Sequence, residues 1–226
     1  MCKSLLITGT NTEIGKTVLT CSLAAYWQSY HSQESLGILK PIQTGIGDCE
    51  LYQQLFELNQ SPTEIAPLQF QMPVAPPVAA AREERQIDLG LAWQAFNTLR
   101  QQRQLVLVEA LGGLGSPITA ELTVADLARD WRLPTVLVVP VELGAIAQAV
   151  ANAALARLSG VLLKGIVLNC VKPNATGQID NLTPIELIES LTNVPVLGIV
   201  PHLAKPTDLA KLAKVASDLD LEFLLK

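Results

Sequence analysis

The stretch that decides the fold is residues 4–17 of the 226-residue chain, SLLITGTNTEIGKT. The run Ser4–Thr8 has the length and bounds of a short buried strand. It leads into a turn bracketed by Gly9 and Gly15, after which the pattern predicts a helix over Lys16–Tyr30. A strand, a glycine-bracketed turn and a helix that opens with Lys-Thr form a phosphate-binding loop, because the N–H groups at the helix N-terminus face the polyphosphate.

The two residues after the second glycine supply the chemistry of this loop. Lys16 is expected to reach the β- and γ-phosphates, and the hydroxyl of Thr17 to bind Mg²⁺. The common pattern GxxxxGK[ST] has its first glycine where Thr10 stands, whereas here Gly9 comes one residue early. The flanking strand and helix still favour a phosphate loop over an ordinary strand–turn–helix with a surface lysine.

Outward from this loop, short apolar runs of 4–6 residues alternate with helical patterns along the chain. We expect further strands at Leu36–Leu39, Leu105–Val108, Thr135–Val139, Gly165–Leu168 and Val196–Val200. We expect further helices at Leu89–Gln102, Val124–Trp131, Ala145–Leu158 and Ile185–Leu191. The alternation predicts an α/β fold, a single domain over residues 1–226 with a doubly wound, mostly parallel sheet and helices on both faces. Ligands bind such sheets beyond the carboxyl ends of the strands.

Capping residues and prolines mark several boundaries. Asp88 is placed to cap the helix that follows it, and the Thr183 hydroxyl precedes Pro184 at another predicted helix start. The proline-rich stretch QMPVAPPVAAA, residues 71–81, predicts either a rigid connector or a cover over a site, since loops beside α/β sites often carry function.

Composition excludes several classes of protein. With 16 basic and 21 acidic residues the net charge is −5, which argues against a nucleic-acid-binding protein, because such proteins need a basic face. Mean hydropathy is +0.32, as expected for parallel strands buried on both faces. The most apolar stretch, residues 145–168, is interrupted by polar and charged side chains, so we expect no membrane span, and the first residues do not resemble a signal peptide. The four cysteines lie far apart in the chain without CxxC spacing: Cys2, Cys21, Cys49 and Cys170. They therefore indicate reduced thiols and a cytoplasmic protein.

Charged residues follow the second and third predicted strands of the chain. Glu109 is placed as a carboxylate ligand of Mg²⁺. Lys40, fixed by Pro41, supplies positive charge for phosphoryl transfer. Asp48 opens a helical run over Cys49–Leu58, where it either completes the metal site or, as its position alone favours, caps the helix.

Six segments resemble, in the same order, motifs of the dethiobiotin synthetase family. The loop GTNTEIGKT at residues 9–17 resembles that family's GTxTxxGKT, early glycine included. The others are LKPIQTG at 39–45 for KPxxSG, APPVAAA at 75–81 for PPHxAA, LVLVEALGG at 105–113 for VLVEGAGG, IVLNC at 166–170 for a strand ending in Asn, and VPHL at 200–203 for a proline turn beside adenine.

The resemblance implies an ATP- and Mg²⁺-dependent ligase of biotin biosynthesis. In the implied reaction, 7,8-diaminononanoate takes up CO2 as a carbamate, and a carbamate oxygen attacks the γ-phosphate of ATP. The second amine then closes the ring of the resulting carbamic–phosphoric anhydride, which gives dethiobiotin, ADP and phosphate. Because phosphoryl transfer depends on positioning and charge neutralisation, a lysine pair and Mg²⁺ suit it.

The resemblance also implies a role for each matching residue. Lys16 and Lys40 would be catalytic, and Thr12 and Thr44 would contact the diamine. The metal ligands would be Thr17, Asp48 and Glu109. Nucleotide and metal together would be held by Glu13, Ile14, Gly15, Lys16, Thr17, Asp48, Glu109, Ala110, Leu111, Gly112, Asn169, Cys170, Pro201, His202, Leu203 and Asp208.

A homodimer is implied as well, in which a helix N-terminus of the partner subunit binds the substrate carboxylate. The segment that resembles this helix start is LGAIAQA, and its backbone at Gly144, Ala145 and Ile146 would bind the carboxylate. The chain departs from the family at Ala147, where an Asn is common, and at Ala110 and Leu111, which stand in place of Gly-Ala.

Two other classes share the predicted fold. A partner-regulated ATPase of the MinD/ParA type carries a second lysine in a KGGxGKT loop, and TNTEIGKT has none. An amidotransferase-type ATPase domain, as in cobyrinate-type synthases, needs a glutaminase module that the 226 residues do not include but a partner chain could supply.

Overall fold

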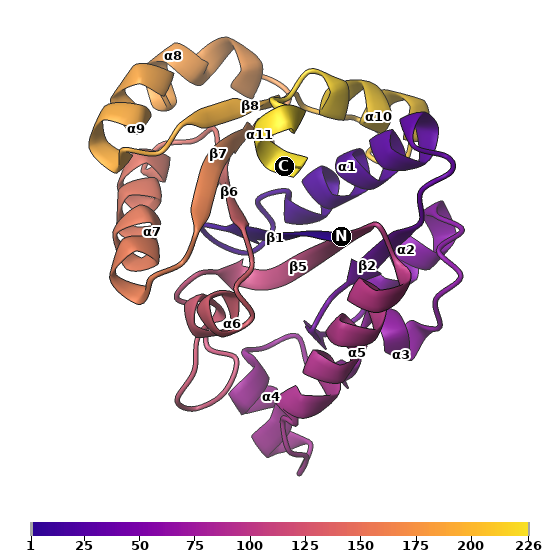
Figure 1. Ribbon diagram of the computed structural model, residues 1–226. Coiled ribbons are helices and arrows are strands. Elements are labelled where there is room, and N and C mark those ends of the chain that lie inside the picture. The colour runs from indigo at the N-terminus through magenta and orange to yellow at the C-terminus, as the bar shows by residue number, and fades with distance from the viewer. Residues whose placement is uncertain (1, 226) are drawn as a thin grey trace.

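The computed structural model describes residues 2–225, and over them six parallel strands form one central sheet in the order β2-β5-β1-β6-β7-β8 (Figure 1). The strands are β1 (Lys3–Gly9), β2 (Leu36–Leu39), β5 (Leu105–Gly113), β6 (Thr135–Pro140), β7 (Leu163–Asn169) and β8 (Val196–Val200). All six predicted strands are present, and the doubly wound parallel sheet is confirmed.

Helices cover both faces of this sheet. One face packs against α1 (Lys16–Tyr30), α2 (Asp48–Leu55), α3 (Pro62–Ile65), α10 (Leu209–Ser217) and α11 (Leu221–Leu225). The other packs against α4 (Pro76–Arg82), α5 (Leu89–Gln102), α6 (Val124–Asp130), α7 (Ala145–Ser159) and α9 (Ile185–Thr192). The 3-10 helix η1 (Ala175–Gln178) and α8 (Ile179–Leu182) join β7 to α9. None of the helices over residues 2–225 has the length and apolar character needed to cross a membrane.

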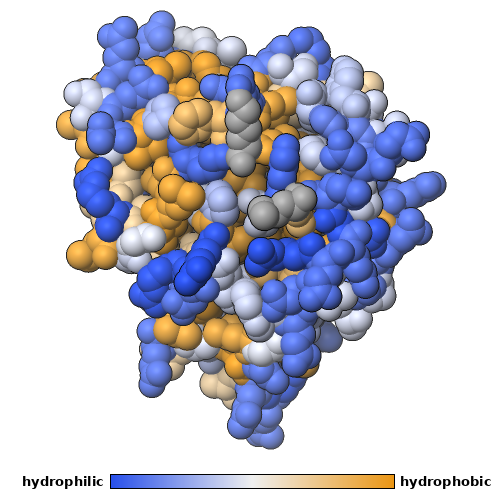
Figure 2. Space-filling model, in the orientation of Figure 1, coloured by the Kyte–Doolittle hydropathy of each residue, from blue (hydrophilic) through white to orange (hydrophobic). Residues whose placement is uncertain are grey.

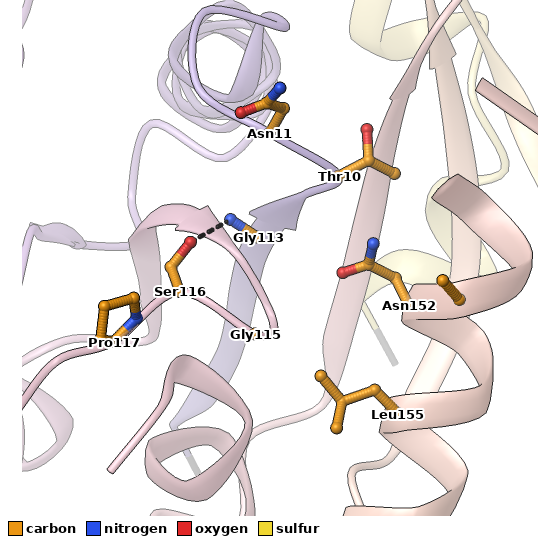
Figure 3. Close-up of a pocket in the computed structure, with 9 residues that line it drawn as sticks. Thr10, Asn11, Gly113, Gly115, Ser116, Pro117, Asn152 and Leu155 are labelled. Atoms are coloured by element: carbon orange, nitrogen blue, oxygen red, sulfur yellow. Dashed lines mark hydrogen bonds between the residues drawn. The ribbon is translucent and has the colours of Figure 1, made fainter. Parts of the chain in front are cut away.

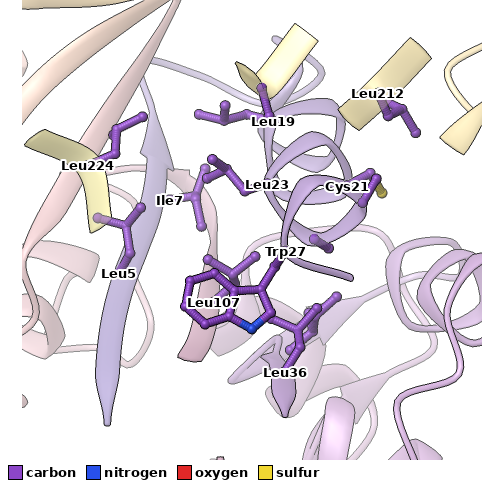
Figure 4. Close-up of a cluster of buried hydrophobic side chains, with 14 of the residues drawn as sticks. Leu5, Ile7, Leu19, Cys21, Leu23, Trp27, Leu36, Leu107, Leu212 and Leu224 are labelled. Atoms are coloured by element: carbon purple, nitrogen blue, oxygen red, sulfur yellow. The ribbon is translucent and has the colours of Figure 1, made fainter. Parts of the chain in front are cut away.

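Residues of β1 alternate between the two sides of the sheet. Leu5 and Ile7 join the apolar cluster beneath α1, whereas Leu6 faces the opposite cluster. Figure 4 shows Trp27 and Leu107 in the first cluster, between α1 and the sheet. On the face seen in Figure 2, hydrophobic residues gather towards α7–α9, whereas the side of α2, α3 and α5 is largely hydrophilic.

Two of the three expected helix caps differ in the structure. Asp88 accepts a hydrogen bond from the Gly90 N–H at 2.9 Å, which confirms that cap. The Thr183 prediction is wrong: Thr183 ends α8, and its buried hydroxyl has no hydrogen-bond partner among residues 2–225. The alternative prediction that the Asp48 side chain caps the following helix is also wrong. Asp48 is the first residue of α2 after the N-cap Gly47, and its side chain points to a lysine.

A second, two-stranded parallel sheet was not predicted. Its strands, β3 (Ile42–Thr44) and β4 (Leu68–Phe70), have three residues each, which is too short to show a periodic pattern. This sheet carries Thr44 to the carboxyl end of the main sheet. In addition, β5 continues five residues past the predicted Val108, through Glu109 to Gly113, because it pairs with β1 up to the Gly9–Gly113 register.

Candidate active site

A cavity of about 650 Å³ lies beside the phosphate loop, at the carboxyl ends of β2 and β5. We call it the phosphate cavity. Predicted site residues that line it are Thr12, Glu13, Lys16, Thr17, Lys40, Thr44, Asp48, Glu109, Leu111 and Gly112. They come from the loop after β1, from residues 40–48 and from the end of β5, so segments about 90 residues apart in the chain meet at one edge of the sheet.

The phosphate loop depends on Gly15. Its φ is +97°, and a Cβ there would lie 1.9 Å from Nδ2 of Asn169, so a larger residue would strain the backbone and displace the Asn169 amide. That same Nδ2 donates a 2.7 Å hydrogen bond to the carbonyl of Ile14. The ammonium of Lys16 donates to the Asn11 carbonyl at 2.8 Å. The loop is therefore supported from inside by its own lysine and from behind by the end of β7.

Two carboxylates and a lysine form a buried cluster in this cavity. The Nζ of Lys40 lies 2.5 Å from Oδ2 of Asp48 and 2.8 Å from Oε1 of Glu109. The side chain of Glu109 is fully buried, and that of Lys40 is 6% exposed. Burial alone would lower the pKa of Lys40, but the charges of Glu109 and Asp48 outweigh it and raise the pKa. Lys40 is therefore a fixed cation at this end of the sheet.

Lys16 has the opposite electrostatic setting. Burial and, to a smaller extent, the nearby charge of Lys40 lower its pKa to about 8, against the opposing effect of the negative charges of Glu109 and Asp48. A polyphosphate beside Lys16 would favour its charged form. The free site therefore holds one fully charged lysine and one whose charge depends on pH and on bound anions.

The hydroxyl of Thr17 lies within hydrogen-bond distance of both carboxylates, 3.1 Å from Oδ1 of Asp48 and 3.1 Å from Oε1 of Glu109. Mg²⁺ prefers oxygen ligands and typically takes one or two carboxylates together with phosphate oxygens and waters. No group of three or more His, Cys, Asp and Glu side chains suited to a metal occurs among residues 2–225. Two carboxylates and a hydroxyl beside a phosphate loop thus fit Mg²⁺ bound together with a nucleotide.

The residues predicted to bind the adenine base do not line the phosphate cavity. Asn169 ends β7 and contacts Ile14, and the N–H of Cys170 donates to Val200 at 2.9 Å. Pro201 and Leu203 follow β8, and Nδ1 of His202 lies 2.9 Å from the Val171 carbonyl oxygen. Of these residues Asn169 contacts the loop directly, and the strand that it ends, β7, lies on the opposite side of β1 from β2, which precedes Lys40.

Asp208 has a local structural role. Its carboxylate accepts a hydrogen bond from the Lys211 N–H at 3.2 Å and caps α10, and Lys211 also pairs with it at 3.5 Å. Its contact with a nucleotide remains a prediction.

The N-terminus of α7 does not reach the phosphate cavity of its own chain. Gly144 is the N-cap of α7 with φ of +90°, Ala145 is buried, and Ile146 packs beside the core. The preceding Leu143 is 89% exposed. A second cavity, of about 460 Å³, lies between the start of the phosphate loop, the turn after β5 and the middle of α7, with Asn152 on the α7 side (Figure 3).

Sequence reasoning missed two residues of the buried cluster. The hydroxyls of Thr20 and Tyr52 both donate to Oε2 of Glu109, that of Thr20 at 2.7 Å. Their only signal in the sequence is spacing, because Thr20 follows Thr17 by three residues and Tyr52 follows Asp48 by four, which places each pair on one helix face. Further cavity-lining residues not predicted are Ile42, Gln43, Gly45, Ile46, Gln71 and Pro73.

Similarity to known proteins decides the family. Residues 3–209 match a family model described as an AAA domain. The ATP-dependent dethiobiotin synthetase BioD of Gloeothece citriformis is 60% identical over 222 residues, which is 98% of each chain. The chain belongs to the dethiobiotin synthetase family. Two further members are the synthetases of Synechocystis sp., 50% identical over 98% of this chain and 94% of that one, and of Bacillus subtilis strain 168, 28% identical over 99% and 97%.

The solved structures that the chain resembles share its fold at low sequence identity. The chain resembles MinD in the MinC:MinD complex of Aquifex aeolicus, with a TM-score of 0.58 and 16% identity over 95% of this chain and 86% of that one. A ParA-family ATPase of Chlorobium tepidum gives 0.56 and 10% over 98% and 92%. These proteins share the α/β architecture of the dethiobiotin synthetase family, but at such low identity they do not favour a MinD-type activity.

Proposed function

We propose that the phosphate cavity is where this chain, one catalytic domain over residues 1–226, closes the ring of dethiobiotin from 7,8-diaminononanoate, CO2 and ATP. As a member of its family, the chain is an ATP- and Mg²⁺-dependent ligase of biotin biosynthesis. The observation that carries the assignment is the convergence of two lysines with a hydroxyl and two carboxylates beside the loop: Lys16, Lys40, Thr17, Asp48 and Glu109.

The nucleotide is held from two sides in this proposal. Backbone N–H groups of residues 13–17 and the side chain of Lys16 bind the phosphates, with the segment 109–112 opposite. Asn169 and Cys170 bind the adenine edge together with the turn 201–203, and Asp208 lies near the nucleotide. Because Asn169 also supports the carbonyl of Ile14, base binding and loop geometry are linked through one side chain.

Mg²⁺, held by Thr17, Asp48 and Glu109, would neutralise charge on the phosphate oxygens. Lys40 stabilises the negative charge of the carbamate, while Thr12 and Thr44 position the diamine. A carbamate oxygen forms a bond to the γ-phosphorus as the bond from phosphorus to ADP breaks, and Lys16 stabilises the oxygens of the group in transfer.

Ring closure follows in the same cavity. The second amine attacks the carbonyl carbon of the carbamic–phosphoric anhydride, its proton is released, and the carbon–oxygen bond to phosphate breaks. The products are the cyclic urea of dethiobiotin and inorganic phosphate. Lys40 and Lys16 stabilise the departing phosphate dianion, so the same two cations assist both steps.

We propose a homodimer in which the partner's α7 completes the site. Gly144, Ala145 and Ile146 form a helix N-terminus, whose N–H groups and dipole suit the substrate carboxylate, although the Ala145 N–H also donates to the Glu142 carbonyl at 3.2 Å. In one chain these residues lie away from the phosphate cavity, and Leu143 beside them is 89% exposed, as expected of an interface residue. We place the enzyme in the cytoplasm, because its reaction uses ATP.

The test is product formation from the diamine, labelled bicarbonate, ATP and Mg²⁺, with each component omitted in turn. We expect acid-stable label in a cyclic urea only when all four are present. No label, with ATP hydrolysis that responds instead to another protein, would contradict the ligase assignment and support the MinD-type alternative.

A further inference from the structure

The carboxylate of Glu109 has different partners on its two oxygens. Oε1 faces the phosphate cavity, where Lys40 donates to it at 2.8 Å and the Thr17 hydroxyl at 3.1 Å. Oε2 faces the interior, where it accepts hydrogen bonds from the hydroxyls of Thr20, at 2.7 Å, and Tyr52. The two oxygens therefore have separate sets of donors, one on the side of the cavity and one on the side of the interior.

Tyr52 connects Glu109 to the helix that carries the other carboxylate. It lies on α2, four residues after Asp48, and it is fully buried in the apolar cluster beneath α1. One helix thus supplies Asp48 on its cavity side and a phenol that holds Glu109 from the interior side. Because the Tyr52 ring is fixed by packing, its hydroxyl is a rigid reference point for the Glu109 carboxylate.

We propose that Tyr52 is a positioning residue, which holds Oε2 of Glu109 so that Oε1 is presented to Mg²⁺ and thereby sets the metal affinity of the site. The proposal rests on the proposed role of Glu109 as a metal ligand. Thr20 supports the same oxygen from α1. Groups that orient metal ligands typically contribute about 10- to 100-fold to metal affinity.

The experiment measures the Kd of Mn²⁺, which serves as a probe of the Mg²⁺ site. Free Mn²⁺ is followed by electron paramagnetic resonance in the presence of ADP, so that no turnover takes place. For Tyr52→Phe, which keeps the buried ring and removes only the hydroxyl, we expect the Kd to rise about tenfold. The matched control is Tyr26→Phe, because Tyr26 lies on α1 among other aromatic rings and away from the cavity. Its Kd should equal that of the wild type.

A second pair of variants keeps the test independent of Tyr52 folding effects. Thr20→Ser retains the hydroxyl and should leave the Kd unchanged, whereas Thr20→Val should raise it as Tyr52→Phe does. If Tyr52→Phe lowers the melting temperature in EDTA but leaves the Kd unchanged, the residue is only structural and the proposal is wrong.

Glu109→Gln separates failure of this proposal from failure of the metal assignment. If Glu109→Gln weakens Mn²⁺ binding and Tyr52→Phe does not, the positioning role alone is overturned. If neither weakens it, Glu109 is not a ligand, and the assignment of the metal site falls together with the positioning role.

Discussion

Replacement of Lys40 by methionine should destabilise the metal-free protein. The substitution keeps an unbranched side chain, one atom shorter because the ammonium is gone, and leaves the fully buried Glu109 without its cation. Removal of one partner from a buried ion pair costs about 3–5 kcal/mol. We expect a value near the lower end, about 3 kcal/mol, because the hydroxyls of Thr20 and Tyr52 still donate to Glu109, and the side chain of Asp48 is 30% exposed.

This free energy gives a measurable shift in melting temperature. For chains of this size each kcal/mol corresponds to about 2–4 °C, so the midpoint in EDTA should fall by roughly 6–12 °C. The control is Lys214→Met, which breaks an ion pair with Asp218 whose side chains are 71% and 59% exposed. Exposed pairs contribute about 0–1 kcal/mol, so this variant should melt within a few degrees of the wild type.

Mg²⁺ and ADP should reverse most of the Lys40→Met deficit, because a bound divalent cation supplies positive charge to the same carboxylates. Turnover should remain lost, since the carbamate would have no cation. Differential scanning fluorimetry, with and without Mg²⁺ and ADP, makes the comparison. A Lys40→Met protein that melts like the wild type in EDTA, or that turns over normally, would refute the reasoning.

Two further outcomes follow from the loop. The pKa of Lys16 is about 8 in the free protein, and the charge of bound phosphates raises it, so ATP binding at pH 8 should take up about 0.5 proton per site. Calorimetry in two buffers of different ionisation enthalpy measures this uptake. Zero uptake would exclude a rise in the pKa of Lys16 on ATP binding. Gly15→Ala should abolish nucleotide binding in a folded protein, because its Cβ would clash with Asn169; equilibrium dialysis with labelled ATP checks this, and normal affinity would contradict it.

Local patterns in the sequence predicted the scaffold. The residues 4–17 predict β1, the loop and α1 because apolar periodicity, glycine and the Lys-Thr pair all act over a few residues. The same is true of the cap formed by Asp88. Three-residue strands such as β3 and β4 carry no such pattern, because their pairing depends on the main sheet and not on their own sequence.

The buried cluster shows where sequence reasoning stops. Asp48 stands at a helix start, where capping is the ordinary role, but in the folded chain Lys40 attracts its carboxylate and Glu50 accepts the N–H of Gly47 instead. Tyr52 is 57 residues from the Glu109 that it contacts, so only the folded structure shows the pair. The residues that carry the predicted chemistry were visible in the sequence, and those that hold them in place were not.

The most direct measurement follows oxygen in a single turnover, with enzyme in excess and freshly added ¹⁸O-labelled CO2 in unlabelled water. If a carbamate oxygen attacks the γ-phosphate, that oxygen stays with phosphorus when the ring closes. We predict that the inorganic phosphate carries one ¹⁸O atom and that this label depends on the diamine. Phosphate without ¹⁸O, formed together with dethiobiotin, would contradict the account, because the bond to phosphorus would then have been made by another nucleophile.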